Sequence, residues 1–321
     1  MPVVLALCPS LPVAQAVCDC TAIIATKNRP FELARTVQSL AAQRVRPRQL
    51  VVVDQSRAAE CHWRLRELLA GGEIELDYIH DAALTGTAAA RNRGMARARG
   101  EIWLFLDDDV ELEPEFTAEL MAAYAAAPEA AGISGIVTNY PPPPLAYRAW
   151  SGMFQRGALH DDRQPLYWRA ERLRHSAPMR VRCLGGGLMS FRAAAIRDVR
   201  FDERHTGSAP GEDVAFCREL AAEARLYVAP RARLMHLRTP NQRERRHWLG
   251  PQAEAVWFWR GARRRPGGLP AAGAWLGFWW FNCGCAAAAT LACARRLSPA
   301  PARDWLAGIQ RARAATGSST V

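Results

Sequence analysis

Lysine is almost absent from this chain: Lys27 is the only one among 42 basic residues, and arginine supplies the rest of a formal net charge of +11. Arginine binds phosphates and carboxylates through a planar fork of donors. The excess of arginine therefore suits nucleotides, nucleic acid or an anionic membrane surface, and charge alone does not choose among them. With 321 residues, half of them hydrophobic, the chain can bury one large α/β core plus an appendage, or two modest domains.

Cysteine pairs of the metal-binding kind are also lacking. The nine cysteines include no C-x-x-C pair and have no nearby histidine at zinc-site spacing. We interpret them as reduced, mostly buried thiols of a cytosolic protein. The first 20 residues are apolar, but they lack a basic start and are broken by Pro9 and Pro12. The sequence therefore predicts no secretory signal and a cytoplasmic location.

Apolar segments alternate with helical ones from residue 21 onwards. Predicted helices cover 31–42 and 88–99, and predicted strands cover 22–25, 50–53, 74–79 and 102–106. Unbroken apolar strands are typical of parallel strands covered on both faces. The alternation predicts an α/β fold with an open, mixed but mainly parallel sheet flanked by helices. Ligands of such sheets lie at the carboxyl ends of the strands.

The second half of the chain is less regular. Four prolines at 141–144 cannot continue a helix or a central strand, and the next strand-like segment is the glycine-rich stretch 183–191. A helix over 213–224 and a strand near 226–228 are predicted to complete the sheet. The expected organisation is an N-terminal extension at 1–20, an α/β domain at 21–238 and a C-terminal helical region at 239–321.

Residues 266–294 carry no formal charge and are long enough to cross a bilayer. They also contain Pro270, Asn282 and several tryptophans, and arginines flank both ends. The charge asymmetry that orients a membrane span is therefore missing, so a helix lying in the interface fits better. A true span and a buried core helix remain as alternatives. The interfacial interpretation predicts a protein peripheral to the inner face of the plasma membrane.

Three aspartates at 107–109 directly follow a wholly apolar predicted strand. In an extended chain alternate side chains share a face, so Asp107 and Asp109 are expected to point together while Asp108 points away. Two carboxylates at a strand end suit Mg²⁺ or Mn²⁺ and leave positions open for diphosphate oxygens. The alternative is a solvated acidic turn or a helix start before Pro114.

Two further charged groups lie at predicted helix starts. Arg91 and Arg93 are placed to meet a nucleotide phosphate or base, or else to face solvent. Asp213 follows Gly211 and Glu212 at the head of a predicted helix. From the residues alone, it is either a helix N-cap or a reactive carboxylate.

The order of these segments resembles that of family 2 glycosyltransferases with a GT-A fold. The matching segments are T-K-N-R at 26–29, Asp54 at a strand end, A-R-N-R-G at 90–94, L-D-D-D-V at 106–110, G-G-G at 185–187, F-D-E at 201–203 and G-E-D-V-A-F at 211–216. The resemblance implies an inverting enzyme that moves sugar from a nucleotide-sugar donor to a hydroxyl of a saccharide or lipid-linked acceptor in cell-surface polysaccharide synthesis. Asp54 is compatible with uracil or thymine, which favours UDP or dTDP donors.

The resemblance also implies roles for individual residues. Nucleotide contacts would come from Thr26, Arg29, Asp54, Arg91 and Asp107. A Mn²⁺ or Mg²⁺ ion would be held by Asp109, Asp107 and His236. Asp213 would be the base that deprotonates the acceptor hydroxyl, and Glu212 and Gly186 would contact the acceptor.

The chain departs from the family pattern in two motifs. Relatives often have N-x-G before the A-R-N block, where this chain has L-T-G at 84–86. Processive synthases carry Q-x-x-R-W and several membrane spans, and residues 242–248 resemble that motif only loosely. Transfer of a single sugar is therefore predicted.

Two other functions compete with this interpretation. A sugar nucleotidyltransferase shares a related layout, but it is expected to have a glycine-rich loop after the first strand, where this chain has A-T-K-N-R at 25–29. A non-catalytic basic protein that binds membranes or nucleic acid would explain the arginines, but it would not explain aspartates at the ends of apolar strands. No nucleic-acid partner is therefore expected.

Overall fold

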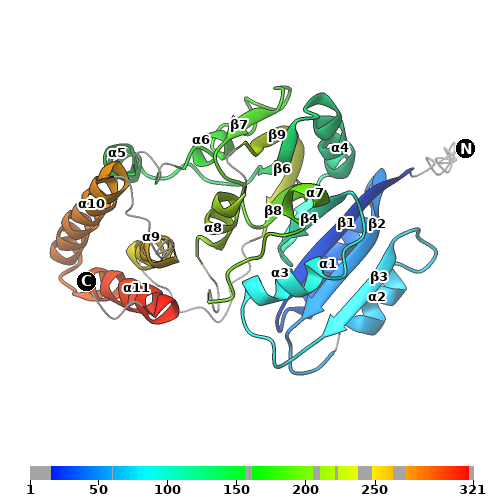
Figure 1. Ribbon diagram of the computed structural model, residues 1–321, viewed down its shortest axis with the longest axis horizontal. Coiled ribbons are helices and arrows are strands. Elements are labelled where there is room, and N and C mark those ends of the chain that lie inside the picture. Colours follow the sequence, from blue (N-terminus) through cyan, green and yellow to red (C-terminus); the bar gives the residue numbers. More distant parts are fainter. Residues whose placement is uncertain are drawn as a thin grey trace, which may run out of the picture.

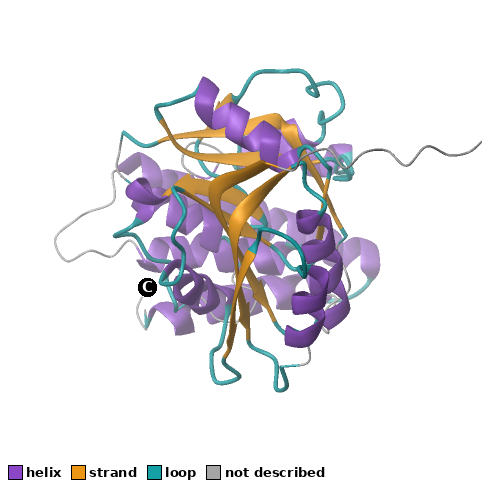
Figure 2. Ribbon diagram, turned by 90° about the vertical axis from the view of Figure 1, so that its right-hand side faces the viewer, coloured by secondary structure: helices purple, strands orange, loops and turns teal. Residues whose placement is uncertain are grey.

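The computed structural model describes residues 16–59, 61–155, 159, 161–204, 210–220, 223–237, 248–262 and 272–317. Within these residues, nine strands form one sheet in the order β3-β2-β1-β4-β8-β6-β9-β5, with β7 paired to β9. Helices lie on both sides of the sheet (Figure 2), and a group of helices from the C-terminal region stands at one end of the molecule (Figure 1).

The first half of the sheet is parallel. Its strands are β3 (Glu75–His80), β2 (Val45–Asp54), β1 (Ala16–Thr26) and β4 (Ile102–Leu106), connected by α1 (Pro30–Ala41), α2 (His62–Leu68) and α3 (Thr87–Met95). Ile23 and Val51 pack in one hydrophobic cluster, and their neighbours Ile24 and Val52 pack in another. Successive side chains of a strand point to opposite faces, so both faces of these strands are buried. The predicted α/β fold is confirmed.

The second half of the sheet is mixed. Strand β8 (Leu188–Arg192) runs antiparallel to β4 and to β6 (Ala130–Val137), whereas β9 (Arg225–His236) runs parallel to β6. The short strands β5 (Val110–Leu112) and β7 (Met179–Val181) are antiparallel to β9. Helices α4 (Phe116–Ala126), α7 (Ala193–Ile196) and α8 (Glu212–Glu219) accompany this half.

Strand β9 is much longer than the predicted strand near 226–228, and its last residue pairs with the first residue of β5. This pairing carries His236 to the turn that holds the three aspartates. The predicted strand-like segment at 183–191 becomes a strand only from Leu188, because residues 184–187 form the turn that leads into β8.

Among the described residues, five further helices lie between β6 and β7 in the chain or follow β9. They are α5 (Leu145–Phe154), α6 (Gln164–Tyr167), α9 (Leu249–Ala262), α10 (Ala272–Arg296) and α11 (Ala300–Thr316). A third hydrophobic cluster joins Leu249 of α9 to Phe278 and Phe281 of α10. A Cβ added at Gly284 would lie 2.3 Å from the ring of Phe154, so the glycine permits close packing of α10 on α5. The region from α9 onwards is helical in its described residues.

Three sequence expectations fall partly outside the described residues. Strand β1 begins at Ala16, inside the expected extension at 1–20, of which residues 1–15 are not described. The Q-x-x-R-W comparison at 242–248 lies outside the description except for its last residue. Of the uncharged stretch 266–294, the structure describes the part from 272, which is continuous helix.

Candidate active site

The turn between β4 and β5 holds the three aspartates, and Asp108 is its buried anchor. Its Oδ2 accepts a hydrogen bond of 2.7 Å from Thr26 Oγ1, and its Oδ1 accepts one of 2.5 Å from Arg29 Nη1. Burial raises the Asp108 pKa to about 7, although Arg29 and Thr26 act in the opposite direction. Asp108 is thus directed toward the end of β1 and toward Arg29, and Arg29 also binds Asp109, so these two carboxylates share one guanidinium.

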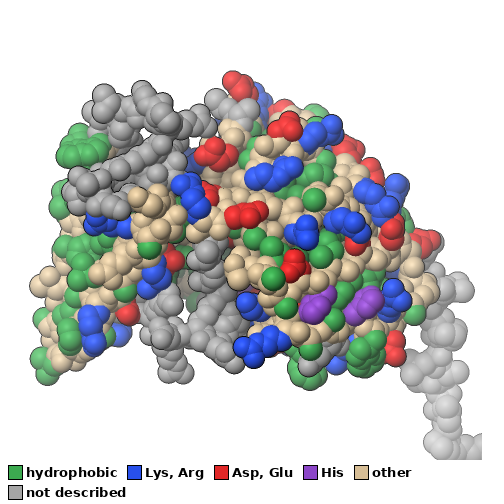
Figure 3. Space-filling model, turned by 60° about the horizontal axis from the view of Figure 1, so that its bottom comes forward, with side chains coloured by type: hydrophobic (Ala, Val, Ile, Leu, Met, Phe, Trp, Pro, Cys, Tyr) green, Lys and Arg blue, Asp and Glu red, His purple; other side chains and the backbone are tan. Residues whose placement is uncertain are grey.

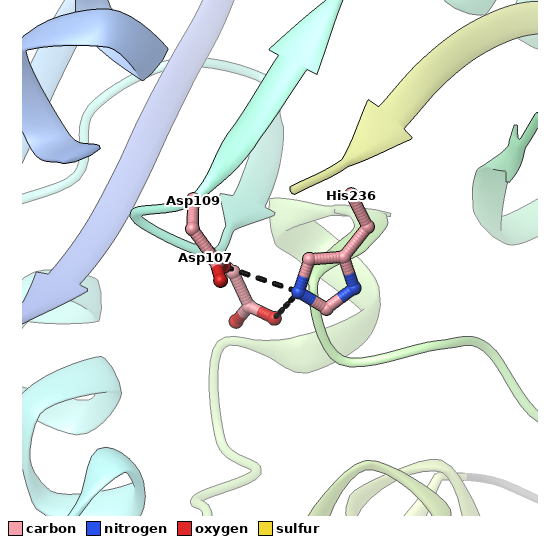
Figure 4. A group of neighbouring side chains, drawn as sticks. All are labelled: Asp107, Asp109 and His236. Carbon is pink, nitrogen blue, oxygen red and sulfur yellow. Dashed lines mark hydrogen bonds and ion pairs between the residues drawn. The ribbon is translucent and has the colours of Figure 1, made fainter. Parts of the chain in front are cut away.

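Asp107, Asp109 and His236 form a compact group at this turn (Figure 4). One ligand atom from each lies within 4.8 Å of the others. The His236 Nε2 is 3.1 Å from Asp109 Oδ1 and 4.0 Å from Asp107 Oδ2. Two carboxylates and an imidazole fit a divalent cation, with further positions left for oxygen atoms of a ligand.

The electrostatics of Asp109 differ from those of Asp108. Burial acts to raise its pKa, but the hydrogen bonds and charges of His236 and Arg29 outweigh burial and lower the pKa to about 2. Arg29 Nη2 donates to Asp109 Oδ2 at 2.9 Å. Asp109 is therefore ionised at neutral pH, which is the state a metal ligand requires.

Arg91 connects three parts of the site. Its buried guanidinium donates through Nη2 to Asp107 Oδ1 at 3.2 Å and to the Gly186 carbonyl oxygen at 2.8 Å, and through Nη1 to Glu212. A Cβ at Gly187 would lie 2.4 Å from Asp107 Oδ2, so a side chain here would displace that carboxylate. The G-G-G segment predicted from the sequence thus packs directly against the aspartate turn.

Glu212 lies next to Arg91 rather than in the cavity described below. Burial, together with the charges of Asp213 and Asp107, raises its pKa to about 7 against the attraction of Arg91. Among the described residues, its second oxygen, Oε2, has no hydrogen-bond partner. The carboxyl of Glu212 is therefore partly protonated near neutral pH.

Asp213 lies in the first turn of α8, but it is not the N-cap. The N-cap is Gly211, whose φ of +84° suits glycine, and this excludes the N-cap interpretation of Asp213. Asp213 Oδ2 accepts from Arg163 Nη1 at 2.9 Å and from the Gly186 N–H at 3.1 Å, and Oδ1 accepts from the Val214 N–H at 2.8 Å.

A single cavity of about 360 Å³ joins these groups. Its lining includes Asp107 and His236, Asp213 with residues 185–187, and Gln252 and Val256 of α9. Two of the three candidate metal ligands, Asp107 and His236, thus line the same cavity as the candidate base, although they come from segments far apart in the sequence.

Asp54 lies at the end of β2 and makes its hydrogen bonds locally. Its Oδ1 accepts from the Ser56 N–H at 2.8 Å, and its Oδ2 accepts from the Tyr78 hydroxyl. Burial and this hydrogen bond raise the Tyr78 pKa. His80, which pairs in register with Asp54, lies 2.8 Å from the Ser56 carbonyl oxygen through Nε2.

The structure thus brings most predicted site residues together. Thr26 is adjacent to Asp54 in the sheet register and bonded to Asp108, so it links the two strand ends. Arg91 is joined to the aspartate turn and α8 instead of to Asp54. Sequence reasoning missed Arg163, which lies in a segment without periodicity, and Tyr78 and His80, which the end of the third predicted strand could have indicated.

The sheet order, the aspartate turn and the carboxylate at the start of α8 define a glycosyltransferase-type α/β fold of the GT-A class. Residues 21–200 match the model of the family described as glycosyl transferase family 2. The chain belongs to this family, and the resemblance inferred from the order of its motifs is confirmed.

The curated relatives of this chain are also named as glycosyltransferases. The chain is 29% identical over 238 residues to the pre-mycofactocin glycosyltransferase of Mycobacterium tuberculosis, which covers 73% of this chain and 45% of the relative. It is 32% identical over 139 residues to the galactofuranosyltransferase GlfT1 of the same organism, covering 42% of this chain and 45% of the relative. The chain therefore spans under half of the length of these relatives.

Solved structures of low sequence identity share the fold. S. aureus TarS 1–349 in complex with UDP-GlcNAc aligns with a TM-score of 0.55 and 16% identity, over 92% of this chain and 81% of that one. The mannosyltransferase PcManGT of Pyrobaculum calidifontis, in complex with GDP-Man and Mn²⁺, aligns with a TM-score of 0.56 and 18% identity, over 96% and 90%. These similarities confirm the predicted GT-A fold.

Proposed function

We propose that the chain is an inverting glycosyltransferase that transfers a single sugar from a nucleotide-sugar donor to a hydroxyl of a saccharide or lipid-linked acceptor. The observation that supports this most strongly is the shared cavity, which contains the Asp107 and His236 ligand atoms at one end and the Asp213 carboxylate beside them. Family membership favours this proposal over a sugar nucleotidyltransferase or a non-catalytic basic protein.

The donor is proposed to bind at the end of the cavity near the aspartate turn, which we call the donor end. Asp109, Asp107 and His236 would hold Mn²⁺ or Mg²⁺ there. When bound, such an ion supplies Lewis-acid stabilisation of the charge that develops on the leaving diphosphate. The relative PcManGT was solved with GDP-Man and Mn²⁺, which supports a divalent ion. The imidazole among these three ligands favours Mn²⁺ over Mg²⁺, because Mg²⁺ prefers oxygen ligands.

The nucleotide is proposed to extend from the donor end along the edge of the parallel sheet. Thr26, Arg29, Asp54, Arg91 and Asp107 would contact it or hold the groups that do so. The sheet register supports this path, because Thr26 lies between Asp54 and the aspartate turn. The Asp54 carboxylate suits the ring N–H of uracil or thymine, which favours UDP or dTDP donors.

Asp213 is proposed to accept the proton of the acceptor hydroxyl. This proton transfer increases the nucleophilicity of the oxygen as it attacks the anomeric carbon opposite the diphosphate, so one displacement inverts the configuration. The cavity beyond Asp213, which we call the acceptor end, holds the acceptor with its reacting hydroxyl near this carboxylate. Gly186 would contact the acceptor. The Glu212 side chain does not line the cavity, so Glu212 would act indirectly, by holding the Arg91 guanidinium.

Turnover by the Asp213→Asn variant tests the assignment of the base. We expect release of nucleoside diphosphate from a panel of UDP-glucose, UDP-galactose, UDP-GlcNAc, dTDP-glucose and GDP-mannose to fall by on the order of 10²-fold or more. Binding of the nucleotide should remain nearly unchanged, because Asp213 takes no part in it. The exposed aspartate Asp198, changed to Asn, is the matched control. Turnover at the wild-type rate by a folded Asp213→Asn variant would remove Asp213 from this role.

The acceptor is further proposed to be presented at a membrane surface. Helix α10 is long and apolar enough to cross a membrane, and one third of its most apolar window is buried. Trp150 Nε1 and Trp257 Nε1 bind this helix through hydrogen bonds of 2.8 Å to the Gly284 carbonyl oxygen and to Asn282. On the exposed part, Leu276 and Leu291 are 64% and 53% exposed. This combination favours a helix that lies on the membrane, in a cytoplasmic protein at its inner face.

Basic side chains support the same orientation. Arg295 and Arg296 end α10 and are exposed. At the end of the molecule where Figure 1 places the C-terminal helices, hydrophobic and basic side chains lie next to one another (Figure 3). Apolar side chains flanked by arginines suit an anionic leaflet. A lipid-linked acceptor for cell-surface polysaccharide would meet the cavity from this side, since α9 both lines the cavity and packs against α10.

Vesicle binding tests the membrane proposal. The wild-type chain should sediment with phosphatidylglycerol vesicles but not with phosphatidylcholine vesicles, and the double variant Leu276→Glu/Leu291→Glu should lose most of this binding. Trp63→Glu on α2 is the control, because this side chain is 62% exposed but lies in the sheet domain. Equal vesicle binding by wild type and the double variant would contradict the proposal.

A further inference from the structure

Arg163 is a buried arginine beside the candidate base, and no sequence pattern identifies it. It precedes α6 and uses all three nitrogens of its guanidinium. Nε and Nη2 donate to the two oxygens of Asp161, each at 2.9 Å, while Nη1 donates to Asp213 Oδ2 at 2.9 Å and to the Leu184 carbonyl oxygen. A guanidinium held by a two-pronged contact on one side has a fixed direction on the other. Asp161 therefore orients Arg163, and Arg163 orients Asp213.

The two oxygens of Asp213 are used differently. Oδ2 accepts from Arg163 Nη1 and from the Gly186 N–H, so both of its lone pairs are engaged. Among the described contacts, Oδ1 accepts only from the Val214 N–H, the amide next in sequence. In Asp213, which lines the cavity, Oδ1 therefore retains a lone pair that accepts no hydrogen bond from the described residues, whereas Oδ2 does not.

We infer that Arg163, held by Asp161, is a positioning residue that fixes the Asp213 carboxylate so that Oδ1 receives the proton of the acceptor hydroxyl. The inference rests on the proposed function of Asp213. In the step, the O–H bond of the acceptor breaks, its proton goes to Oδ1, and its electron pair forms the new bond to the anomeric carbon while the bond to the diphosphate oxygen breaks.

The same contacts connect the base to the donor end. Gly186 donates its N–H to Asp213 and accepts at its carbonyl oxygen from Arg91, which also bonds Asp107. A Cβ at Gly186 would lie 3.3 Å from Arg91 Nη1 and 3.5 Å from Asp213 Cβ, so both side chains pack closely against this residue. The position of the base relative to the aspartate turn is therefore set by fixed hydrogen bonds, as in-line attack requires.

A double-mutant cycle between Arg163 and Asp213 tests the inference. Arg163→Gln should lower kcat for nucleotide release from the panel above by about 10- to 100-fold, because a misplaced base loses effective alignment. KM for the nucleotide sugar should change by less than about twofold, since donor contacts are untouched. In the Asp213→Asn background, Arg163→Gln should add less than about twofold, because a positioning residue acts only through the residue it positions. Arg163→Lys should restore part of kcat.

Folding is controlled separately, because Arg163→Gln leaves the buried carboxylate of Asp161 without its partner. The double variant Asp161→Asn/Arg163→Gln keeps two hydrogen-bonding side chains without charge, and it should show the same loss of kcat as Arg163→Gln. Arg172→Gln, an exposed arginine of the same segment, is the control and should be fully active.

Three outcomes would overturn the inference. One is wild-type kcat in a folded Asp161→Asn/Arg163→Gln variant. Another is a loss in the Asp213→Asn background as large as the loss in the wild-type background, since that would mean a general structural role. The third is full activity of Asp213→Asn itself, which would remove the proposed base and the inference with it. Loss of activity in Asp213→Asn with none in the Arg163 variants would leave the proposed function standing alone.

Discussion

The donor end and the acceptor end of the cavity are built in different ways. At the donor end, charged side chains hold one another: Arg29 binds Asp108 and Asp109, and Arg91 binds Asp107. At the acceptor end, the wall includes the apolar Val256 and the amide side chain of Gln252 from α9, which lies beyond the family match at 21–200. A charged end held by ion pairs suits the diphosphate of a UDP- or dTDP-sugar, and a wall from outside the family segment suits an acceptor particular to this chain.

Among the changes that test this difference between the two ends, the largest effect is expected from crowding the donor end. Gly187→Ala places a Cβ only 2.4 Å from Asp107 Oδ2. The Asp107 carboxylate must therefore move away from Arg91, Asp109 and His236. We expect turnover of the nucleotide-sugar panel to fall by about 10²-fold, because a displacement of about 1 Å is enough to misalign reacting groups.

Gly152→Ala is the control for this substitution. No atom lies within 4 Å of a Cβ added at Gly152, and the residue lies within α5. The control should keep full activity and full stability. Wild-type turnover by Gly187→Ala would show that the donor end is less rigid than the comparison requires.

A smaller effect concerns the pH dependence of stability. The folded-state pKa of Glu212 is raised to about 7 from an ordinary value of 4.5, so the folded state binds a proton more tightly than the unfolded state. This contribution to stability is complete below the ordinary pKa and is lost as pH rises through about 7. Glu212→Gln removes it, so the unfolding free energy of the variant relative to wild type should rise by about 1–3 kcal/mol between pH 5 and pH 8.

Chemical denaturation of both proteins at the two pH values measures this difference. Glu203→Gln on the nearby surface is the control, and its relative stability should not depend on pH to this extent. A pH-independent difference for Glu212→Gln would mean that Glu212 stays ionised between pH 5 and pH 8 as a buried partner of Arg91.

The smallest effect is expected at the acceptor end. Gln252 of α9 lines the cavity and accepts a hydrogen bond of 3.0 Å from Gln155. Gln252→Ala should raise KM for an alkyl glycoside acceptor about three- to tenfold, the worth of one neutral hydrogen bond, and leave KM for the donor unchanged. Gln38→Ala on the exposed side of α1 is the control. An equal rise in donor KM would erase the distinction between the two ends.

The donor end was more predictable than the acceptor end for physical reasons. The strand at 102–106 follows from a local pattern, because a buried strand is continuously apolar. Residues 107–109 lie in the turn after this strand, so the grouping of Asp107 with Asp109 and His236 depends on the turn and on β9 rather than on strand alternation. His236 could be placed only by family resemblance, since its position depends on the long pairing of β9 with β5. The positions of Arg163 and of the α9 residues in the cavity wall depend on contacts between distant segments. No periodic pattern in the sequence predicts these contacts.

Calorimetric titration of UDP, dTDP and GDP, with and without Mn²⁺, tests the central claim most directly. The wild-type chain and Asp109→Ala are compared, with Asp198→Ala as an exposed control. We predict that the wild type binds UDP or dTDP in a Mn²⁺-dependent manner, and that Asp109→Ala loses this binding by at least about tenfold because a charged metal ligand is gone. Binding of none of these nucleotides by the folded wild type, or equal binding by Asp109→Ala, would contradict the account.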